Sequence, residues 1–241
     1  MLQVQHSPAM PTVTETLALP QGPTRVQWRR SARARRVSLR IDAQGGGVIV
    51  TLPPRAARAA GVALLMDHAG WVAERLARLP GPVELTDGAV VMLDGQPYRV
   101  RHVPGGRGGA WLEAGEIRVA GEAGFLPRRV RDLLRGEAAR RLGALAAERA
   151  AAAGLRPRRV VVKDTRTRWG SCTADGTLMF CWRLVMAPPE VQHYVVAHEV
   201  AHLRHMNHGA EFWALVAELT PHRRSAMRWL AAEGAGLLRV G

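Results

Sequence analysis

An H-E-x-x-H motif at residues 198–202, set in an apolar helical stretch, constrains the fold of this chain more than any other feature. Residues four apart on an α-helix point the same way, so His198 and His202 can bind one metal ion. Glu199 lies beside them, where a carboxylate could take a proton from metal-bound water. The alternative is a pair of core histidines hydrogen-bonded to backbone, with the glutamate at a surface. Because the neighbouring residues are apolar, the helix should be buried, and a divalent cation would satisfy the three polar side chains.

A catalytic zinc ion needs a third protein ligand if it keeps an open position for water. The best candidate is His208, because the asparagine and glycine on either side of it can end the helix and turn the chain back toward the metal. Glu211 and Glu218 are rival ligands from the helix expected next in the chain. For the stabilisation of an oxyanion the sequence offers Tyr194, His205 and Arg168.

Five segments of the second half carry a resemblance to a known family. They are Arg168-Trp169-Gly170-Ser171-Cys172, Trp182 through Pro188, Tyr194 through His202, Asn207-His208-Gly209 and Phe212-Trp213. Together they resemble the YgjP-like family of metal-dependent hydrolases, which is related to the SprT and WLM zincin-type peptidases. Segments of the first half resemble the family too, so the resemblance covers about residues 24 to 233.

The resemblance implies a role for each residue that matches the family motif. It implies that His198, His202 and His208 are the metal ligands and that Glu199 is the catalytic acid/base. It also implies a zincin-like metallopeptidase fold for the second half of the chain. The chain departs from the family pattern at Cys181, where asparagine is expected. That departure bears on the hydrogen bonding beside the site and not on the metal ligands.

The motif and the resemblance predict a zinc-dependent hydrolase. We expect a metallopeptidase that binds one Zn²⁺ ion, activates water with a glutamate general base and acts on peptide or protein substrates. Two alternatives keep the metal. One is a metal-dependent hydrolase of nucleotide phosphoanhydrides, because arginine side chains bind phosphate well. The other is a nucleic-acid-binding module in which the metal only braces the fold.

The chain is strongly basic, and its charge comes almost entirely from arginine. Its formal net charge is +14, and lysine occurs once, at Lys163. Seven arginines crowd one short region: Arg25, Arg29, Arg30, Arg33, Arg35, Arg36 and Arg40. This region could be a surface that binds nucleic acid or phosphate, or it could be the solvated side of two strands.

The hydrophobic periodicity predicts an α+β chain in three parts. Residues 1–22 are expected to form a disordered tail. Residues 23–122 are expected to form a β-rich amino-terminal subdomain with one helix at 56–79. Residues 123–241 are expected to contain a small sheet and the H-E-x-x-H helix, and the family resemblance implies that they form a zincin-like metallopeptidase domain. The other expected helices lie at 127–153, 188–206, 210–219 and 222–233. The expected strands lie at 24–30, 36–42, 48–52, 90–93, 98–102, 116–119, 159–163, 167–172 and 177–182.

The sequence also bears on the compartment. No apolar run reaches the length that spans a bilayer, and the first twenty residues lack the pattern of a secretory signal, so we expect a cytoplasmic protein without a membrane partner. In that compartment Cys172 and Cys181 should remain thiols. The sequence does not specify an oligomeric state.

Overall fold

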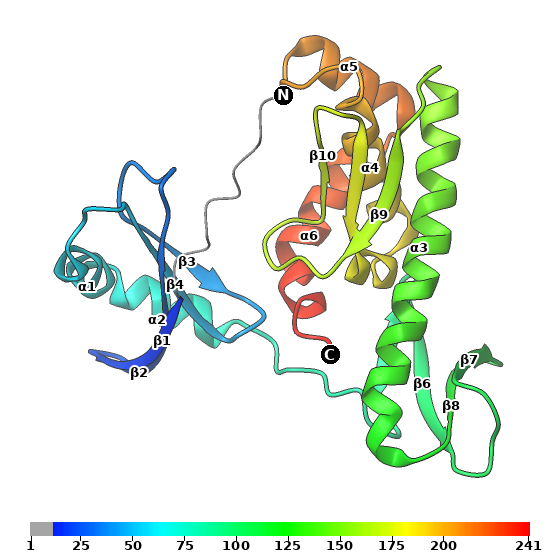
Figure 1. Ribbon diagram of the computed structural model, residues 1–241, viewed down its shortest axis with the longest axis horizontal. Coiled ribbons are helices and arrows are strands. Elements are labelled where there is room, and N and C mark those ends of the chain that lie inside the picture. The colour runs from blue at the N-terminus through cyan, green and yellow to red at the C-terminus, as the bar shows by residue number, and fades with distance from the viewer. Residues whose placement is uncertain (1–11) are drawn as a thin grey trace, which may run out of the picture. The chain divides into compact units, whose positions relative to one another are not determined.

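The computed structural model describes residues 12–241, which divide into two compact units between Pro80 and Gly81 (Figure 1). The fold mixes helices with several small sheets, as the sequence predicts. The division does not fall at the predicted boundary between residues 122 and 123. Strands of the segment before that boundary share one core with the helix that follows it, so the structure holds them in the same unit.

The amino-terminal unit is a four-stranded sheet with strand order β1-β2-β4-β3 and two short helices. The elements are β1 (Val13–Leu19), β2 (Gly22–Arg30), β3 (Ser38–Asp42), β4 (Gly47–Leu52), α1 (Arg58–Asp67) and α2 (Ala69–Ala77). Strands β2 and β4 are parallel, and the two outer strands run antiparallel to their neighbours. One face of the sheet is apolar, and it forms the core of this unit with Leu65 and Val72 of the helices.

Strand β1 lies in the segment that the sequence predicts to be a disordered tail, so that prediction is wrong for residues 13–19. Alternation along the strand puts Leu17 and Leu19 against the apolar core. Glu15 accepts a hydrogen bond from the Trp28 indole at 2.6 Å and also pairs with Arg58, which ties the strand to the rest of the unit. Residues 1–11 lie outside the described residues, and the tail remains a prediction there.

The single helix predicted at residues 56–79 is two helices, because the chain leaves helical geometry at His68. The first of them, α1, lies very close to the sheet at Gly61. A Cβ atom at this position would lie 2.5 Å from Cζ3 of Trp28. The absent side chain therefore sets the distance at which α1 packs on the sheet.

The carboxy-terminal unit contains two sheets and four α-helices. One sheet has the order β5-β6-β8-β7, and the other has the order β10-β11-β9. The strands are β5 (Val90–Leu93), β6 (Gln96–Val103), β7 (Ala110–Glu113), β8 (Glu116–Ala120), β9 (Arg159–Lys163), β10 (Gly170–Cys172) and β11 (Thr177–Cys181). The helices are α3 (Leu126–Ala152), α4 (Pro189–Ala201), α5 (Ala210–Leu219) and α6 (Arg223–Leu237), with 3-10 turns η1 (Ala123–Phe125) and η2 (Trp182–Met186). Strand β7 has no counterpart among the predicted strands.

Helix α3 runs along this unit and joins its two sheets (Figure 1). It contacts β7 and β8 of one sheet and β9, η2 and α4 beside the other. Its buried stripe repeats every four residues: Leu126, Val130, Leu134, Ala138, Leu142, Ala146 and Ala150. Within residues 12–241, no helix is long and apolar enough to cross a membrane.

Candidate metal centre

Helix α4 and the turn after it carry the four residues of the predicted site. His198 and Glu199 lie in the last turn of α4, and His202 is the residue at which the helix ends. The sequence predicts this helix to continue to residue 206, but the amides of the next three residues bond to the carbonyls of Val200 and Ala201 and close a turn. The chain then comes back, so that His208 directly precedes Gly209, the N-cap of α5.

The structure brings the three histidine rings together. One nitrogen of each of His198, His202 and His208 lies within 4.8 Å of the other two. The ring centroids are 4.8 to 5.0 Å apart. The Nε2 atoms of His198 and His208 lie 3.2 Å apart. Two nitrogen ligands of a tetrahedral zinc ion, each at about 2.1 Å, lie roughly 3.4 Å apart, so the observed spacing is close to that of ligands that share a cation.

The protonation of the imidazoles also fits a cation. Burial, together with the charges of the neighbouring His202, His208 and Arg223, lowers the pKa of His198 to about 4. Burial likewise lowers the pKa of His202, against the opposing effect of the His205 carbonyl. That carbonyl lies 2.9 Å from Nδ1 of His202 and orients the ring, which leaves Nε2 for a metal. Each neutral ring has one nitrogen with a free lone pair, and a divalent cation bound between the rings would accept these lone pairs.

The surroundings of the cluster are aromatic. Phe212 packs against all three imidazole rings, with centroid distances of 4.6 to 5.0 Å. Trp213 stacks on His208, and the guanidinium of Arg223 lies 3.5 Å from the centre of the Trp213 ring. These contacts fix the rings, but Nδ1 of His198 is buried without a hydrogen-bond partner among the described residues. The site thus holds one imidazole by packing and another by a backbone hydrogen bond.

Glu199 is buried beside the histidines, against strand β10. Only 7% of the surface of Glu199 is exposed to solvent. Burial raises the pKa of the Glu199 carboxyl to about 7, and the charge of Arg168 opposes this effect. A Cβ atom on Gly170 would lie 2.6 Å from Cγ and 2.7 Å from Oε1 of Glu199. Gly170 is therefore part of the site, although the sequence indicates it only as one letter of the Arg168–Cys172 segment.

A cleft of about 300 Å³ opens over this group. One wall is strand β10, and the other carries the metal-site side chains. The lining residues are Gly170, Ser171, Cys172, His198, Glu199, His202, Met206 and His208. Because β10 forms an edge of its sheet, one side of the strand is left without a partner strand in the part of the chain that the structure describes.

The rival ligands lie outside the histidine cluster. The Glu211 side chain is 85% exposed and pairs with His205 at 3.5 Å, and Glu218 is exposed on α5. Burial, together with the charges of Glu199 and Asp175, raises the pKa of the Cys172 thiol to about 11, so the free thiol is protonated at neutral pH. Cys172 and Cys181 are both free thiols.

The three candidates for oxyanion stabilisation differ in position. Tyr194 is buried one turn before His198, with a ring centroid 6.1 Å from that imidazole. Arg168 is exposed but close enough to Glu199 to affect its pKa. His205 turns its side chain to Glu211 and its carbonyl to His202. The His205 side chain is thus paired with Glu211, which leaves Tyr194 and Arg168 as candidates for oxyanion stabilisation.

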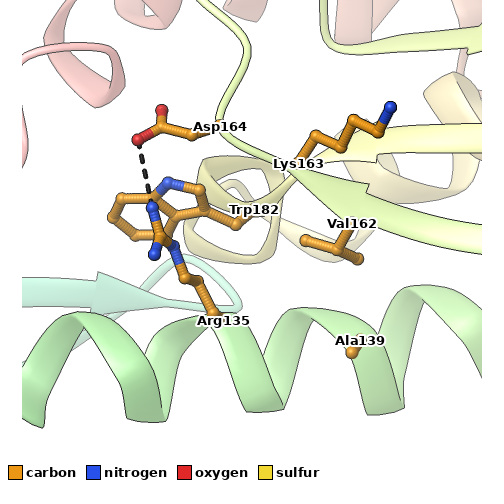
Figure 2. Close-up of a pocket in the computed structure, with 6 residues that line it drawn as sticks. All are labelled: Arg135, Ala139, Val162, Lys163, Asp164 and Trp182. Atoms are coloured by element: carbon orange, nitrogen blue, oxygen red, sulfur yellow. Dashed lines mark hydrogen bonds and ion pairs between the residues drawn. The ribbon is translucent and has the colours of Figure 1, made fainter.

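A larger hollow in the same unit, of about 570 Å³, lacks this chemistry (Figure 2). Arg135 of α3 faces Asp164 across it, and the two side chains pair at 3.2 Å. Asp164 also accepts a hydrogen bond from the fully buried Arg183, which donates another to the Val240 carbonyl. The carboxylate is thus already engaged by arginines, and the hollow contains no histidine.

The comparisons with known proteins bear on this site. A model of the YgjP-like family, described as a metallopeptidase domain, matches residues 35–233. Among solved structures, the chain is similar to the metallopeptidase zymogen of Pyrococcus abyssi abylysin. The two chains are 18% identical, the similarity covers 37% of this chain and 92% of that one, and the TM-score is 0.35. A TM-score this low does not establish a shared fold. No curated protein matches the chain.

Proposed function

The chain belongs to the YgjP-like metallopeptidase family, and we propose that it is a zinc-dependent peptidase. Membership supports a metal-dependent hydrolase. The observation that carries the finer proposal is the cleft in which three imidazoles converge beside one buried carboxylate. In this proposal His198, His202 and His208 hold one zinc ion, and Glu199 is the general base.

The donor set favours zinc among the divalent metals. Imidazole ligands suit zinc, and three protein ligands leave a fourth position open, as catalytic zinc sites require. When bound there, zinc supplies a Lewis acid for a carbonyl oxygen and lowers the pKa of water toward neutrality. The aromatic side chains around the rings, Phe212 and Trp213, keep them at the spacing that this ion needs.

Glu199 would move the proton in the reaction. Its carboxylate lines the same cleft as the imidazoles, and Gly170 allows the strand to lie directly against it. A carboxylate fixed in this way can accept a proton from the attacking water on an Oε atom. The same oxygen can then give the proton to the nitrogen of the leaving amine. Gly170 therefore acts as a positioning residue for the base.

Strand β10 would hold the substrate. The residues just before and just after β10 form backbone hydrogen bonds with the segment of the neighbouring strand β11. The Cys181 amide donates to the Trp169 carbonyl, and the Thr173 amide donates to the Thr177 carbonyl. By the alternation of an antiparallel ladder, the backbone groups of Gly170 and Cys172 point away from that strand and toward the outer edge. An extended peptide can add to such an edge through main-chain hydrogen bonds, which favours a peptide over a compact substrate.

The test compares wild type with Glu199→Gln after loading both with zinc. The assay is hydrolysis of a fluorescently labelled unfolded protein, with a nucleoside triphosphate as a parallel substrate. We expect both proteins to keep one zinc ion and kcat for the unfolded protein to fall by about a hundredfold or more in the variant. Equal rates would contradict the role of Glu199. Hydrolysis of the nucleotide alone would replace the peptidase with a phosphoanhydride hydrolase, and zinc binding without any hydrolysis would leave a structural metal.

A further inference from the structure

The outer face of the amino-terminal sheet carries a group of arginines that the proposed peptidase does not use. Side chains alternate along a strand, and Val26 and Trp28 of β2 point into the apolar core. Arg25 and Arg29 therefore lie on the opposite face, and both are exposed. On β3, Leu39 and Ile41 pack against the core, so Arg40 lies on the same outer face as the β2 arginines.

The register of the sheet brings two of these arginines near each other. Arg29 pairs with Thr51 on β4, and Arg40 pairs with Ile49, two residues earlier on the same strand. The two guanidinium groups thus flank β4 from either side. Burial lowers the pKa of Arg40, and the charge of Arg29 lowers it further, as expected for two like charges at short range, whereas the charge of Asp42 opposes both effects. The sheet holds two cations together across an uncharged strand.

The loop between β2 and β3 extends this charge. It follows directly on the end of β2 and adds three exposed arginines: Arg33, Arg35 and Arg36. We call these three and the sheet arginines Arg25, Arg29 and Arg40 the basic face. Residues 12–80 contain 11 arginines against 4 acidic residues, a net charge of +7, so half of the excess charge of the chain lies in under a third of its length.

Within residues 12–241, no member of the basic face forms an ion pair. Other arginines of the same unit are engaged. Arg58 pairs with Glu15, Arg78 pairs with Glu74, and Arg30 donates hydrogen bonds to three backbone carbonyls. The unit therefore engages some of its arginines in structure and leaves the six arginines of the basic face without an ion pair among the described residues.

We propose that the basic face binds the phosphate backbone of a nucleic acid without reading its sequence. Guanidinium groups bind phosphate oxygens strongly, and several of them along a sheet match a ligand with repeated charges. Hydroxyl and amide side chains lie among the arginines on the same face and can donate to phosphates as well: Thr14, Thr16, Gln27, Ser38 and Thr51.

The composition of the face favours a nucleic acid over a membrane. The exposed large hydrophobic residues described in this unit are Val13, Met66 and Trp71. Val13 pairs with Trp28 and so points to the core side of the sheet, and the other two lie on the helices. The basic face thus has no side chain that would insert into lipid and no exposed aromatic ring on which a base would stack. Binding should depend on phosphate contacts.

The experiment uses the full chain and fluorescence anisotropy. The probes are duplex DNA, single-stranded DNA and single-stranded RNA of one length, each titrated from about 50 mM to about 300 mM salt. The test variant is Arg25→Gln/Arg29→Gln/Arg40→Gln. The matched control, Arg55→Gln/Arg75→Gln/Arg78→Gln, removes the same charge from exposed positions of the same unit outside the basic face. Because Arg40 is half-buried, the double variant Arg25→Gln/Arg29→Gln separates lost contacts from lost folding.

We expect wild type to bind at low salt and the affinity to fall steeply as salt rises. The triple variant should lose about tenfold or more in affinity, and its salt slope should be smaller by about two to three. The control should change the affinity by less than about threefold. Equal losses in the two triple variants would contradict a defined face, and so would binding to phosphatidylserine vesicles without binding to any nucleic acid. These binding measurements need no zinc, so their outcome does not depend on whether the chain is a peptidase.

Discussion

The histidine cluster and the basic face place ionisable groups in opposite environments. In the cluster, burial keeps His198 and His202 neutral, and their ring nitrogens face one another. On the basic face, Arg25 and Arg29 are charged, exposed and without acidic partners among the described residues. The lone pairs of the first arrangement would be balanced by a cation, and the positive charges of the second by an anion. In each region the protein's own groups indicate the chemistry of the ligand.

The largest expected effect comes from removing one imidazole of the cluster. His202→Ala takes away a proposed metal ligand, whose ring the His205 carbonyl orients. We expect the purified variant to retain much less than one zinc ion per chain and hydrolysis of an unfolded protein to fall by about three orders of magnitude. Elemental analysis and the hydrolysis assay measure the two quantities. Wild-type zinc content in this variant would remove His202 from the ligand set.

A smaller effect is expected from Gly170→Ala, which leaves all four site residues in place. The new Cβ would lie within 2.7 Å of the Glu199 carboxyl group, so the base or the strand must shift. We expect kcat to fall by about ten- to a hundredfold while the zinc content stays the same. Gly143→Ala, on α3, is the matched control, because a Cβ there meets nothing within 4 Å. A full-rate Gly170→Ala enzyme would show that β10 does not position the base.

A substitution in the amino-terminal unit should lower its stability without changing zinc binding at the proposed metal site. Gly61→Ala would put a Cβ 2.5 Å from the Trp28 ring and force α1 away from the sheet. We expect this to lower the free energy of unfolding by about 1–3 kcal/mol in urea titrations, without loss of bound zinc. Gly70→Ala on α2 has its nearest atom at 4.0 Å and should not destabilise the unit. Equal behaviour of the two variants would contradict the close packing of α1.

The smallest expected effect concerns pH. Hydrogen bonds from Trp28 and Arg58 lower the pKa of Glu15 from its ordinary value of 4.5. A carboxyl whose pKa is lowered in the folded state stabilises it above the unfolded pKa, and this contribution is lost as the pH falls through the folded pKa. Between about pH 6 and about pH 3, the Tm of wild type should therefore fall more than that of Glu15→Gln. Parallel curves for the two proteins would show that β1 is not held by this contact.

Several features of the fold follow from local sequence patterns, and others do not. The periodicity of α3 and the apolar run of α4 predict those helices because one helix face must meet the core. The strand at Val13–Leu19 depends on contacts with residues farther along the chain, such as Trp28, which periodicity cannot report, and the apolar stripe of residues 56–79 does not mark the break at His68. The division after Pro80 likewise depends on which elements share a core.

The site divides in the same way. The helical spacing of His198, Glu199 and His202 fixes their common face, so the sequence could place them together. The position of His208 depends on the turn formed around Asn207 and Gly209, residue types that commonly end helices. The structure brings the His208 ring next to the rings of His198 and His202. Gly170 could not be found from its surroundings in the sequence, because its contact with Glu199 joins a strand to a helix that follows much later. The catalytic and ligand roles themselves stay predictions.

The most direct test of the account is X-ray absorption at the zinc edge on the purified full chain and on His208→Ala. For the full chain we predict one zinc ion with three imidazole ligands at about 2.0–2.1 Å and one lighter oxygen donor. In His208→Ala the number of imidazoles should fall to two. A sulfur ligand from Cys172, or three imidazoles that persist in the variant, would contradict the claim that His198, His202 and His208 share one metal ion.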